Sequence, residues 1–434
     1  MVLMNKLVLL FILLSQLFSI QLDQSDLKYL CGQVTEVEDH PILGITLQQQ
    51  PKDGGAYGKI YFTVDPWTGS EVALKAIKIE EDFILPLAIN EITILRMMRG
   101  RFDMMSIPMQ NGCYYDSDTV YIIMPKAKVD LGMLLAFSSR DQNEPYVRSY
   151  VWKAYITNFL VNIVCNLHDL NVLHLDIKAD NFLLKDFFNP VLTDFGLSNG
   201  VDPISEYDPF PTYTENRYLG TEGFMAEEIK TGTYYRQTDI FALGITIMQI
   251  WFIKSNEQYE SFNGLTVVSI IQMCQQIDNL DKETNEYYFC KFYYDIVSKM
   301  TNKYYNKRPL GQALKQMIGD ATTRLIQQIA KDYTQLQYDS KNQSPASSNV
   351  DYSFNLHNRD IRWFMEEFIK SKREEMNSNR SYMEFMLGIN APIFRAYKDK
   401  GIKLLGFSID AFLSGTVLDD VQIPPIISPQ HLVI

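Results

Sequence analysis

The most informative stretch of the chain is His174-Leu175-Asp176-Ile177-Lys178-Ala179-Asp180-Asn181, which Asp194-Phe195-Gly196 follows after a short interval. It places a carboxylate, an ammonium group and an amide within one short segment, and a second carboxylate soon after. These groups suit in-line phosphoryl transfer with bound magnesium. One carboxylate would orient the attacking hydroxyl, the lysine would neutralise charge on the moving group, and the amide and second carboxylate would hold metal. Such chemistry depends on positioning and charge neutralisation more than on covalent catalysis.

The chain before this stretch is expected to be rich in strands. Residues 59–64 and 72–79 have strand-type composition, and a turn at Asp65-Pro66-Trp67-Thr68-Gly69 separates them. Residues 120–124 predict a buried strand that Pro125 ends. Residues 87–98 carry apolar side chains at helical spacing, with Glu91 among them.

The chain after residue 130 is expected to be helical. A long apolar stripe covers residues 146–170, and residues 310–329 are amphipathic. Residues 240–252 are apolar nearly all round, which predicts a helix buried at the centre of its lobe. A strand-rich unit therefore precedes a helix-rich unit.

A glycine-rich run and a lysine–glutamate pair precede the catalytic stretch. The glycine-rich run Lys52-Asp53-Gly54-Gly55-Ala56-Tyr57-Gly58 lies just before a strand, where glycines let backbone amides approach phosphates. Lys75 ends the apolar run Val72-Ala73-Leu74-Lys75, and the Glu91 carboxylate could pair with it. Taken singly, the glycines would favour a plain hairpin turn and Lys75 would favour a surface lysine, and Glu91 could be a solvated residue on a helix face.

Taken together, these segments resemble the eukaryotic protein kinase family over roughly residues 45–330, and Lys178, two residues after Asp176, resembles the serine/threonine type. The resemblance implies an α+β, two-lobed protein kinase fold. A small antiparallel-sheet N-lobe with one main helix would span about 45–125, and a larger helical C-lobe about 130–330. Further matching segments are Gly220-Thr221-Glu222-Gly223-Phe224-Met225-Ala226-Glu227-Glu228, Asp239-Ile240-Phe241-Ala242-Leu243-Gly244 and Lys307-Arg308-Pro309.

The resemblance also implies a role for each catalytic position. Asp176 would accept the proton of the substrate hydroxyl, with Lys178 and Thr221 beside it. Lys75 would bind the α- and β-phosphates and pair with Glu91, while Asn181 and Asp194 would hold Mg²⁺. Lys78 is a rival candidate for the phosphate-binding lysine. We favour Lys75 because residues 68–75 resemble the corresponding segment of cyclin-dependent kinases. Glu228 would pair with Arg308 in a structural role.

The resemblance implies the ATP site as well. Gly54, Gly55 and Gly58 would form the phosphate loop. The adenine ring would lie between Ile60, Ala73 and Leu183, with Met124 closing the back of the pocket. Pro125 lacks an N–H but would offer its carbonyl, and Ala127 would supply the other backbone hydrogen bonds.

The chain departs from the family pattern at several positions. Asp53 stands where the first loop glycine is expected and Lys52 where an apolar residue is usual, so nucleotide affinity could be reduced. Leu175 replaces the arginine that normally grips a phosphorylated residue of the activation loop, which predicts activity that depends little on that phosphorylation. Glu227 replaces a proline before Glu228.

The function that the resemblance implies is transfer of the γ-phosphoryl group of Mg-ATP to serine or threonine hydroxyls of protein substrates. The alternative is a pseudokinase that keeps the fold and acts as a nucleotide-binding or protein-binding scaffold. The net charge of −12 argues against a nucleic-acid partner.

The remaining segments concern location and organisation. Residues 7–20 resemble the apolar region of a signal peptide, or an anchor that would contact membrane if retained, whereas the family suggests the cytoplasm. Five scattered cysteines are interpreted as separate thiols, which favours a reducing compartment. Residues 332–360 are interpreted as a polar linker and residues 361–434 as a C-terminal extension of unknown role.

Overall fold

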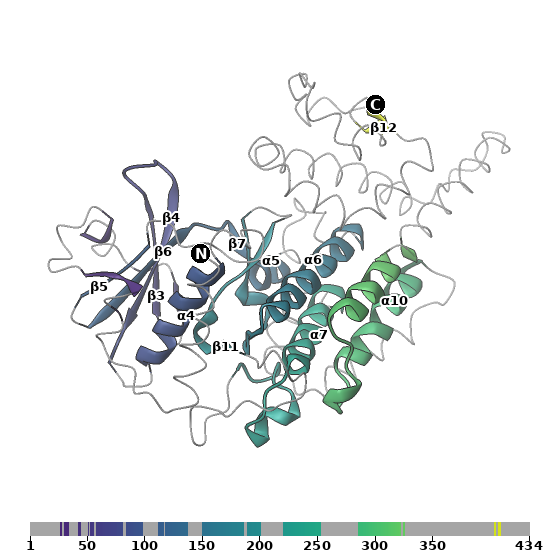
Figure 1. The fold of residues 1–434 in the computed structure, drawn as a ribbon. Helices are drawn as coiled ribbons and strands as arrows, with labels where there is room; N and C mark the ends of the chain where they lie inside the picture. The colour runs from purple at the N-terminus through teal and green to yellow at the C-terminus, as the bar shows by residue number, and fades with distance from the viewer. Residues whose placement is uncertain are drawn as a thin grey trace. The chain divides into compact units, whose positions relative to one another are not determined.

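The structure is a computed structural model of the 434-residue chain, shown in Figure 1. It divides into two compact units, Met1–Ile318 and Gly319–Ile434. The residues that it describes are 27, 30–33, 42–44, 51, 53–55, 58–80, 84–98, 112–116, 118–137, 150–185, 189–200, 220–252, 285–322, 324–325, 403–404 and 407–408.

The first unit begins with a six-stranded sheet in the order β1-β5-β6-β4-β3-β2. All neighbouring strands are antiparallel except β1 and β5, which run parallel. The main helix of this lobe is α4(Ile84–Met98), which starts three residues before the expected position because Pro86 is tolerated in a first turn. The strands are β1(Gly32–Gln33), β2(Asp53–Gly55), β3(Gly58–Val64), β4(Glu71–Lys78), β5(Cys113–Tyr115) and β6(Thr119–Pro125).

The central strand β4 directs alternate side chains to opposite faces of the sheet, as the period of two requires. Val72 and Leu74 are fully buried on one face, in a cluster with Tyr61, Tyr121 and Ile123 of the neighbouring strands. Lys75 lies on the opposite face, where it contacts α4. The lysine is therefore held by a strand whose other face is anchored in an apolar core.

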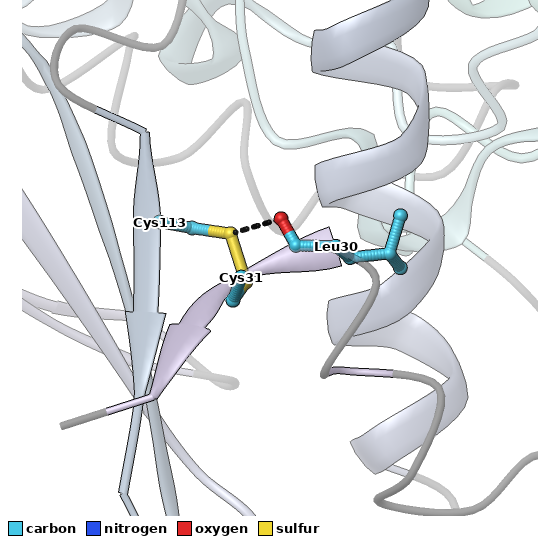
Figure 2. The surroundings of a disulfide bond; sticks show 3 residues. All are labelled: Leu30, Cys31 and Cys113. Atoms are coloured by element: carbon cyan, nitrogen blue, oxygen red, sulfur yellow. Dashed lines mark hydrogen bonds between the residues drawn. A yellow bond between two sulfur atoms is a disulfide. The ribbon is translucent and has the colours of Figure 1, made fainter.

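The segment before residue 45 also belongs to this sheet. Ile42 and Leu43 are buried in the apolar cluster just described, and Cys31 forms a disulfide with Cys113 at the start of β5 (Figure 2). The interpretation of the cysteines as separate thiols is thus wrong for this pair. Their sequence spacing carries no sign of the parallel pairing of β1 with β5, which brings together two residues 82 positions apart. Cys165 and Cys290 are free and buried, and Cys274 lies outside the described residues.

The second part of this unit is built from helices α5(Leu131–Phe137), α6(Tyr150–Asp169), α7(Arg236–Phe252) and α10(Asn285–Met300), and residues 311–318 are also helical. Helix α7 packs against both α6 and α10, and these helices lie side by side in Figure 1. Trp251 of α7 stacks on Tyr293 of α10, with ring centroids 3.9 Å apart, and donates a 2.9 Å hydrogen bond to Thr157 of α6. The prediction of a helix buried at the centre of its lobe is confirmed for α7.

Short strands flank both residues 174–181 and Asp194. Residues 174–181 connect β8(Val172–Leu173) to β9(Phe182–Leu184) and end in the 3-10 helix η3(Ala179–Asn181). Asp194 follows β10(Pro190–Leu192) and precedes η4(Phe195–Leu197) and β11(Asn199–Gly200). Strand β9 pairs with β10 and with β7(Val129–Asp130), and β11 pairs with β8, so both acidic segments are tied to one another through backbone hydrogen bonds. The predicted two-lobed α+β fold is confirmed.

The second unit is described at residues 319–322 and 324–325, which are helical, and at β12(Lys403–Leu404) and β13(Phe407–Ser408), which pair antiparallel. The N-terminal residues 1–20, the polar linker at 332–360 and the rest of the extension lie outside the described residues. Where the structure describes the chain, no helix combines the length and the apolar character that a membrane crossing needs.

Candidate active site

The backbone of the catalytic segment is held by one buried carboxylate of helix α7. Asp239 accepts hydrogen bonds from the backbone N–H groups of His174 and Leu175, both at 2.8 Å, and lies 2.9 Å from the His168 Nε2 atom. Leu175 has a φ of 64°, in the left-handed region that side chains disfavour. The hydrogen bonds to Asp239 stabilise this turn, which immediately precedes Asp176.

Asp176 lies at the centre of a hydrogen-bonded network with the residues expected around it. Thr221 Oγ1 donates to Asp176 Oδ1 at 2.6 Å, and Lys178 Nζ donates to Thr221 Oγ1 at 2.8 Å. Lys178 Nζ also lies 3.1 Å from Asp176 Oδ2. Asn181 Nδ2 donates to the Asp176 backbone carbonyl at 2.7 Å and to its Oδ2 at 3.0 Å. Four sequence-predicted residues are thus brought within direct contact.

A second network joins the sheet, helix α4 and the segment after β10. Lys75 Nζ lies 2.9 and 2.7 Å from the two carboxylate oxygens of Glu91 and 2.7 Å from Asp194 Oδ1. Burial alone would lower the pKa of Lys75, but the carboxylates of Glu91 and Asp194 raise it above its usual value. Burial tends to raise the pKa of Asp194, yet the neighbouring Lys75 holds it below its usual value. Lys75 is therefore cationic and Asp194 anionic at neutral pH.

The same network decides between the two candidate lysines. The side chain of Lys78 is 59% exposed and pairs with Glu80 at 2.9 Å, whereas that of Lys75 is 11% exposed. Because β4 alternates its faces, two lysines three positions apart cannot both face α4. Lys75 is the lysine in contact with Glu91 and Asp194.

Asn90 is a residue of this site that sequence reasoning missed. Its Nδ2 atom lies 3.2 Å from the Phe195 carbonyl and 3.1 Å from the Gly196 carbonyl, and it also contacts the Ser198 carbonyl oxygen. An amide with two protons is thereby placed among three carbonyls of the turn that follows Asp194. The signal for Asn90 was weak, since it is one polar side chain on α4 beside Glu91, but it joins α4 to the turn that carries Asp194.

The pair Asn181 and Asp194 has the chemistry that Mg²⁺ requires. Asp194 is ionised and its side chain is 36% exposed, although Lys75 contacts one of its oxygens. Asn181 uses its Nδ2 group to bind Asp176, which leaves its amide oxygen as the atom with ligand character. Magnesium prefers such oxygen ligands and usually takes only one or two carboxylates from the protein. The two residues fit the ion that the resemblance implies.

The residues expected around an adenine ring come from both lobes. Ile60 of β3, Ala73 of β4 and Leu183 of β9 are all half-buried, whereas Met124 of β6 is buried. Ala73 and Met124 are paired across β4 and β6, and Pro125 is the last residue of β6. Ala127 follows between Lys126 and Lys128, whose N–H groups donate to the carbonyls of Glu71 and Leu184.

The three glycines of the expected phosphate loop lie in one hairpin. Gly54 and Gly55 are in β2, Gly58 begins β3, and the register pairs Gly55 with Gly58. Gly58 has a further constraint, because a Cβ atom there would come within 3.0 Å of the Ala76 carbonyl oxygen. Asp53 pairs with Ile60 across this hairpin, so the residue that departs from the family pattern is part of β2.

Leu175 lies in an apolar cluster where the family pattern has an arginine. The cluster contains the buried residues Leu173, Leu175, Ile229 and Tyr234, with Leu197 and Met225 packed against it. The backbone of Gly220 also approaches Leu175, since a Cβ at Gly220 would lie 2.9 Å from the Leu175 carbonyl oxygen. Apolar packing thus joins the catalytic segment to the residues on both sides of residues 201–219, which lie outside the described part of the chain.

Glu228 and Arg308 form the ion pair that the sequence predicted. The Arg308 guanidinium contacts both Glu228 carboxylate oxygens and donates to the Gln237 carbonyl at 3.0 Å and, through Nε, to the Asn302 carbonyl at 2.8 Å. The arginine side chain is fully buried. The pair joins the 3-10 helix η5(Glu227–Thr231) to the segment after η7(Tyr305–Lys307).

The two-lobed fold, with Lys75 paired to Glu91 and a carboxylate, lysine and threonine joined at Asp176, is the arrangement of protein kinases. The family model described as "Protein kinase domain" matches residues 54–318, more than half of the chain. The chain therefore belongs to the protein kinase family.

Several curated proteins are similar to this chain. The L-type lectin-domain containing receptor kinase VIII.1 of Arabidopsis thaliana is 27% identical over 202 residues, which cover 45% of this chain and 26% of that protein. The serine/threonine-protein kinase 4 homolog B of Dictyostelium discoideum is 28% identical over 219 residues, 50% of this chain and 18% of that protein. The serine/threonine-protein kinase PAK 1 of Mus musculus is 28% identical over 219 residues, 50% of this chain and 36% of that protein. The chain thus spans only a minor part of the length of these relatives.

Proposed function

We propose that this protein transfers the γ-phosphoryl group of ATP to serine or threonine hydroxyls of protein substrates. The observation that carries the proposal is the joined set of Asp176, Thr221 and Lys178, in which one hydroxyl bridges a carboxylate and an ammonium group. A substrate hydroxyl beside Asp176 Oδ2 would meet a base that can accept its proton and, next to it, a cation. The serine/threonine names of two relatives support the same choice of acceptor.

The remaining site residues would bind and neutralise the phosphates. The Lys75 ammonium, kept charged by Glu91 and Asp194, would contact the α- and β-phosphates. Asn181 and Asp194 would hold magnesium, whose charge offsets that of the phosphate oxygens when it is bound. Lys178 would stabilise charge that develops on the transferred group.

The base of the nucleotide would lie against the half-buried side chains of Ile60, Ala73 and Leu183. Its polar edge would meet the backbone between Pro125 and Ala127. The neighbouring N–H groups of Lys126 and Lys128 already donate to carbonyls of the protein, which favours Ala127 as the donor to the base. Gly54, Gly55 and Gly58 would let the β2–β3 hairpin approach the phosphates.

The test compares the wild-type protein with the variants Asp176→Asn and Asp180→Asn in a radiolabelled ATP assay on a generic protein substrate. The variant Asp180→Asn makes the same chemical change at an exposed residue of the same segment and serves as the matched control. In Asp176→Asn the new amide can no longer accept a proton, so we expect phosphoryl transfer to fall by roughly 100-fold or more. Equal rates for wild type and Asp176→Asn would contradict the proposal.

The scaffold alternative rests on one observation, the position of Asp53 in β2 opposite Ile60. A carboxylate close to the phosphates would weaken ATP binding by repulsion. A thermal-shift titration with Mg-ATP on wild type and Asp53→Gly measures this effect directly. The active-kinase proposal expects both to bind, with Asp53→Gly binding more tightly, whereas a scaffold that has lost nucleotide binding would show no shift in the wild type.

A further inference from the structure

The disulfide between Cys31 and Cys113 lies outside the catalytic machinery and joins two distant parts of the chain. Cys31 precedes β1 and Cys113 begins β5, and their Cα atoms are 4.9 Å apart (Figure 2). The next two residues of each strand are paired in parallel, Gly32 with Tyr114 and Gln33 with Tyr115. The covalent bond therefore continues the register of the strands by one residue.

Cys31 belongs to a short N-terminal strap, which we define as residues 27, 30–33 and 42–44. The strap precedes the region that matches the kinase family and is anchored by the buried side chains of Leu27, Ile42 and Leu43. The pairing of β1 with β5 extends over only two residues, and such a short ladder is marginal by itself. The disulfide is thus the strongest single attachment between the strap and β5.

The surroundings of the two sulfur atoms favour a disulfide over other uses of a cysteine pair. The residues are 7% and 3% exposed, and within the described chain no cluster of His, Cys, Asp and Glu could hold a metal ion. The Cys113 sulfur lies 3.1 Å from the Leu30 carbonyl oxygen. Because a bridged sulfur has no proton to donate, this approach is a packing contact in the oxidised state.

We infer that the protein folds in an oxidising compartment, where the Cys31–Cys113 disulfide fixes the strap to the catalytic domain. Disulfides form and persist in secretory and extracellular environments and are rare in the cytosol. The apolar run at residues 7–20, which resembles a signal-peptide core, points to the same compartment on independent grounds. The inference does not depend on whether the kinase is active.

The chemical step is thiol–disulfide exchange with an external disulfide. The thiolate of one cysteine attacks that disulfide and forms a mixed disulfide, and the second cysteine then displaces the external thiol. The Cys31 and Cys113 thiols lose two protons and two electrons in total, and the external disulfide is reduced to two thiols. The reverse reaction, with a reducing dithiol, would break the covalent link between the strap and β5.

The first test maps the thiols of the full chain after expression through the secretory pathway of a eukaryotic cell. The protein is denatured with an alkylating reagent, with and without prior reduction, and analysed by mass spectrometry. We expect Cys31 and Cys113 to be alkylated only after reduction, and Cys165 and Cys290 to be alkylated in both samples. Alkylation of Cys31 and Cys113 without reduction would overturn the inference, as would failure of the chain to enter the secretory pathway.

The second test measures thermal unfolding of the wild type and of the double variant Cys31→Ser/Cys113→Ser, each with and without a reducing agent. We expect reduction to lower the Tm of the wild type by roughly 5–10 °C and to leave that of the double variant unchanged. An equal effect of reductant on both proteins, or on neither, would show that the bond does not stabilise the domain. Thiol mapping still decides the inference if the double variant fails to fold.

Discussion

Thr221 is the residue on which the geometry of the proposed catalytic centre depends most directly. Its hydroxyl donates to Asp176 and accepts from Lys178, so one oxygen fixes the positions of the proposed base and the proposed phosphate-binding cation. A charged acceptor and a charged donor make both hydrogen bonds stronger than neutral ones. Lys178 and Asp176 also pair directly, since Lys178 Nζ lies 3.1 Å from Asp176 Oδ2.

The variants Thr221→Ala and Thr221→Ser therefore form a matched pair. Alanine removes the bridging hydroxyl, and we expect kcat to fall by roughly 10- to 100-fold because Asp176 and Lys178 lose their positions. Serine retains the hydroxyl and should keep most of the activity. Steady-state kinetics on a peptide substrate measures both, and a loss of activity in Thr221→Ser equal to that in Thr221→Ala would contradict this role.

Leu175 gives a second prediction at the scale of single residues. The apolar cluster around Leu175 contacts Leu197 and Met225, and its packing requires no charged partner on a phosphorylated residue. We expect the triple variant Ser205→Ala/Thr212→Ala/Thr214→Ala to keep its activity within about threefold of the wild type, which is roughly 0.6 kcal/mol in activation free energy. The same assay after phosphatase treatment is the control, and loss of activity in either case would show that phosphorylation is required.

At the scale of elements, helix α4 and the turn after β10 act as one unit. Glu91 joins α4 to Lys75 of β4, and Asn90 joins the same helix to the backbone of η4. Lys75 in turn contacts Asp194, the residue that begins this turn. Two neighbouring side chains of α4 thus join this helix to β4 and to the distant turn that carries Asp194, and a shift of α4 would disturb both Lys75 and Asp194.

The second junction between elements is the ion pair of Glu228 in η5 with Arg308. Because the arginine is fully buried, Arg308→Ala would leave the Glu228 carboxylate without its compensating charge. We expect the free energy of unfolding to fall by about 3–5 kcal/mol, measured by urea denaturation. The control is Lys303→Ala, which removes an exposed partner 3.9 Å from Glu227 and should change stability little. Similar losses in the two variants would contradict the importance of burial.

At the scale of the whole molecule, the catalytic domain is longer at its N-terminus than the region that matches the family. Ile42 and Leu43 are part of the apolar core of the sheet, and the disulfide at Cys31 encloses a loop with a sequence separation of 82. In the chain-entropy treatment, closing a loop of that length stabilises the folded state by roughly 4–5 kcal/mol. A fragment that begins at residue 54 would lose both contributions.

The sequence predicted the parts of this molecule in which local pattern and chemistry coincide. The alternation of β4, the apolar character of α7 and the close spacing of Asp176, Lys178 and Asn181 are all properties of short segments, and each was found where expected. The Lys75–Glu91 pair was also foreseen, although Lys78 remained a rival until the face of β4 was known.

The features that sequence reasoning missed depend on contacts between distant segments. Asn90 is significant only because η4 lies beside α4, and neither segment alone indicates this. The Cys31–Cys113 bond depends on the parallel pairing of β1 with β5, which has no signature in two residues of strand. Such contacts are set by tertiary packing, which overrides local propensity.

The most direct test of the proposed active site compares the initial rates of γ-phosphoryl transfer to a serine/threonine peptide library by wild type, Lys75→Met and Lys78→Met. The two variants make the same change three residues apart on one strand, in a buried lysine that contacts Glu91 and Asp194 and in an exposed one that does not. We predict that Lys78→Met transfers phosphate at the wild-type rate and that Lys75→Met is slower by roughly 100-fold or more. Equal rates for Lys75→Met and wild type would contradict the account.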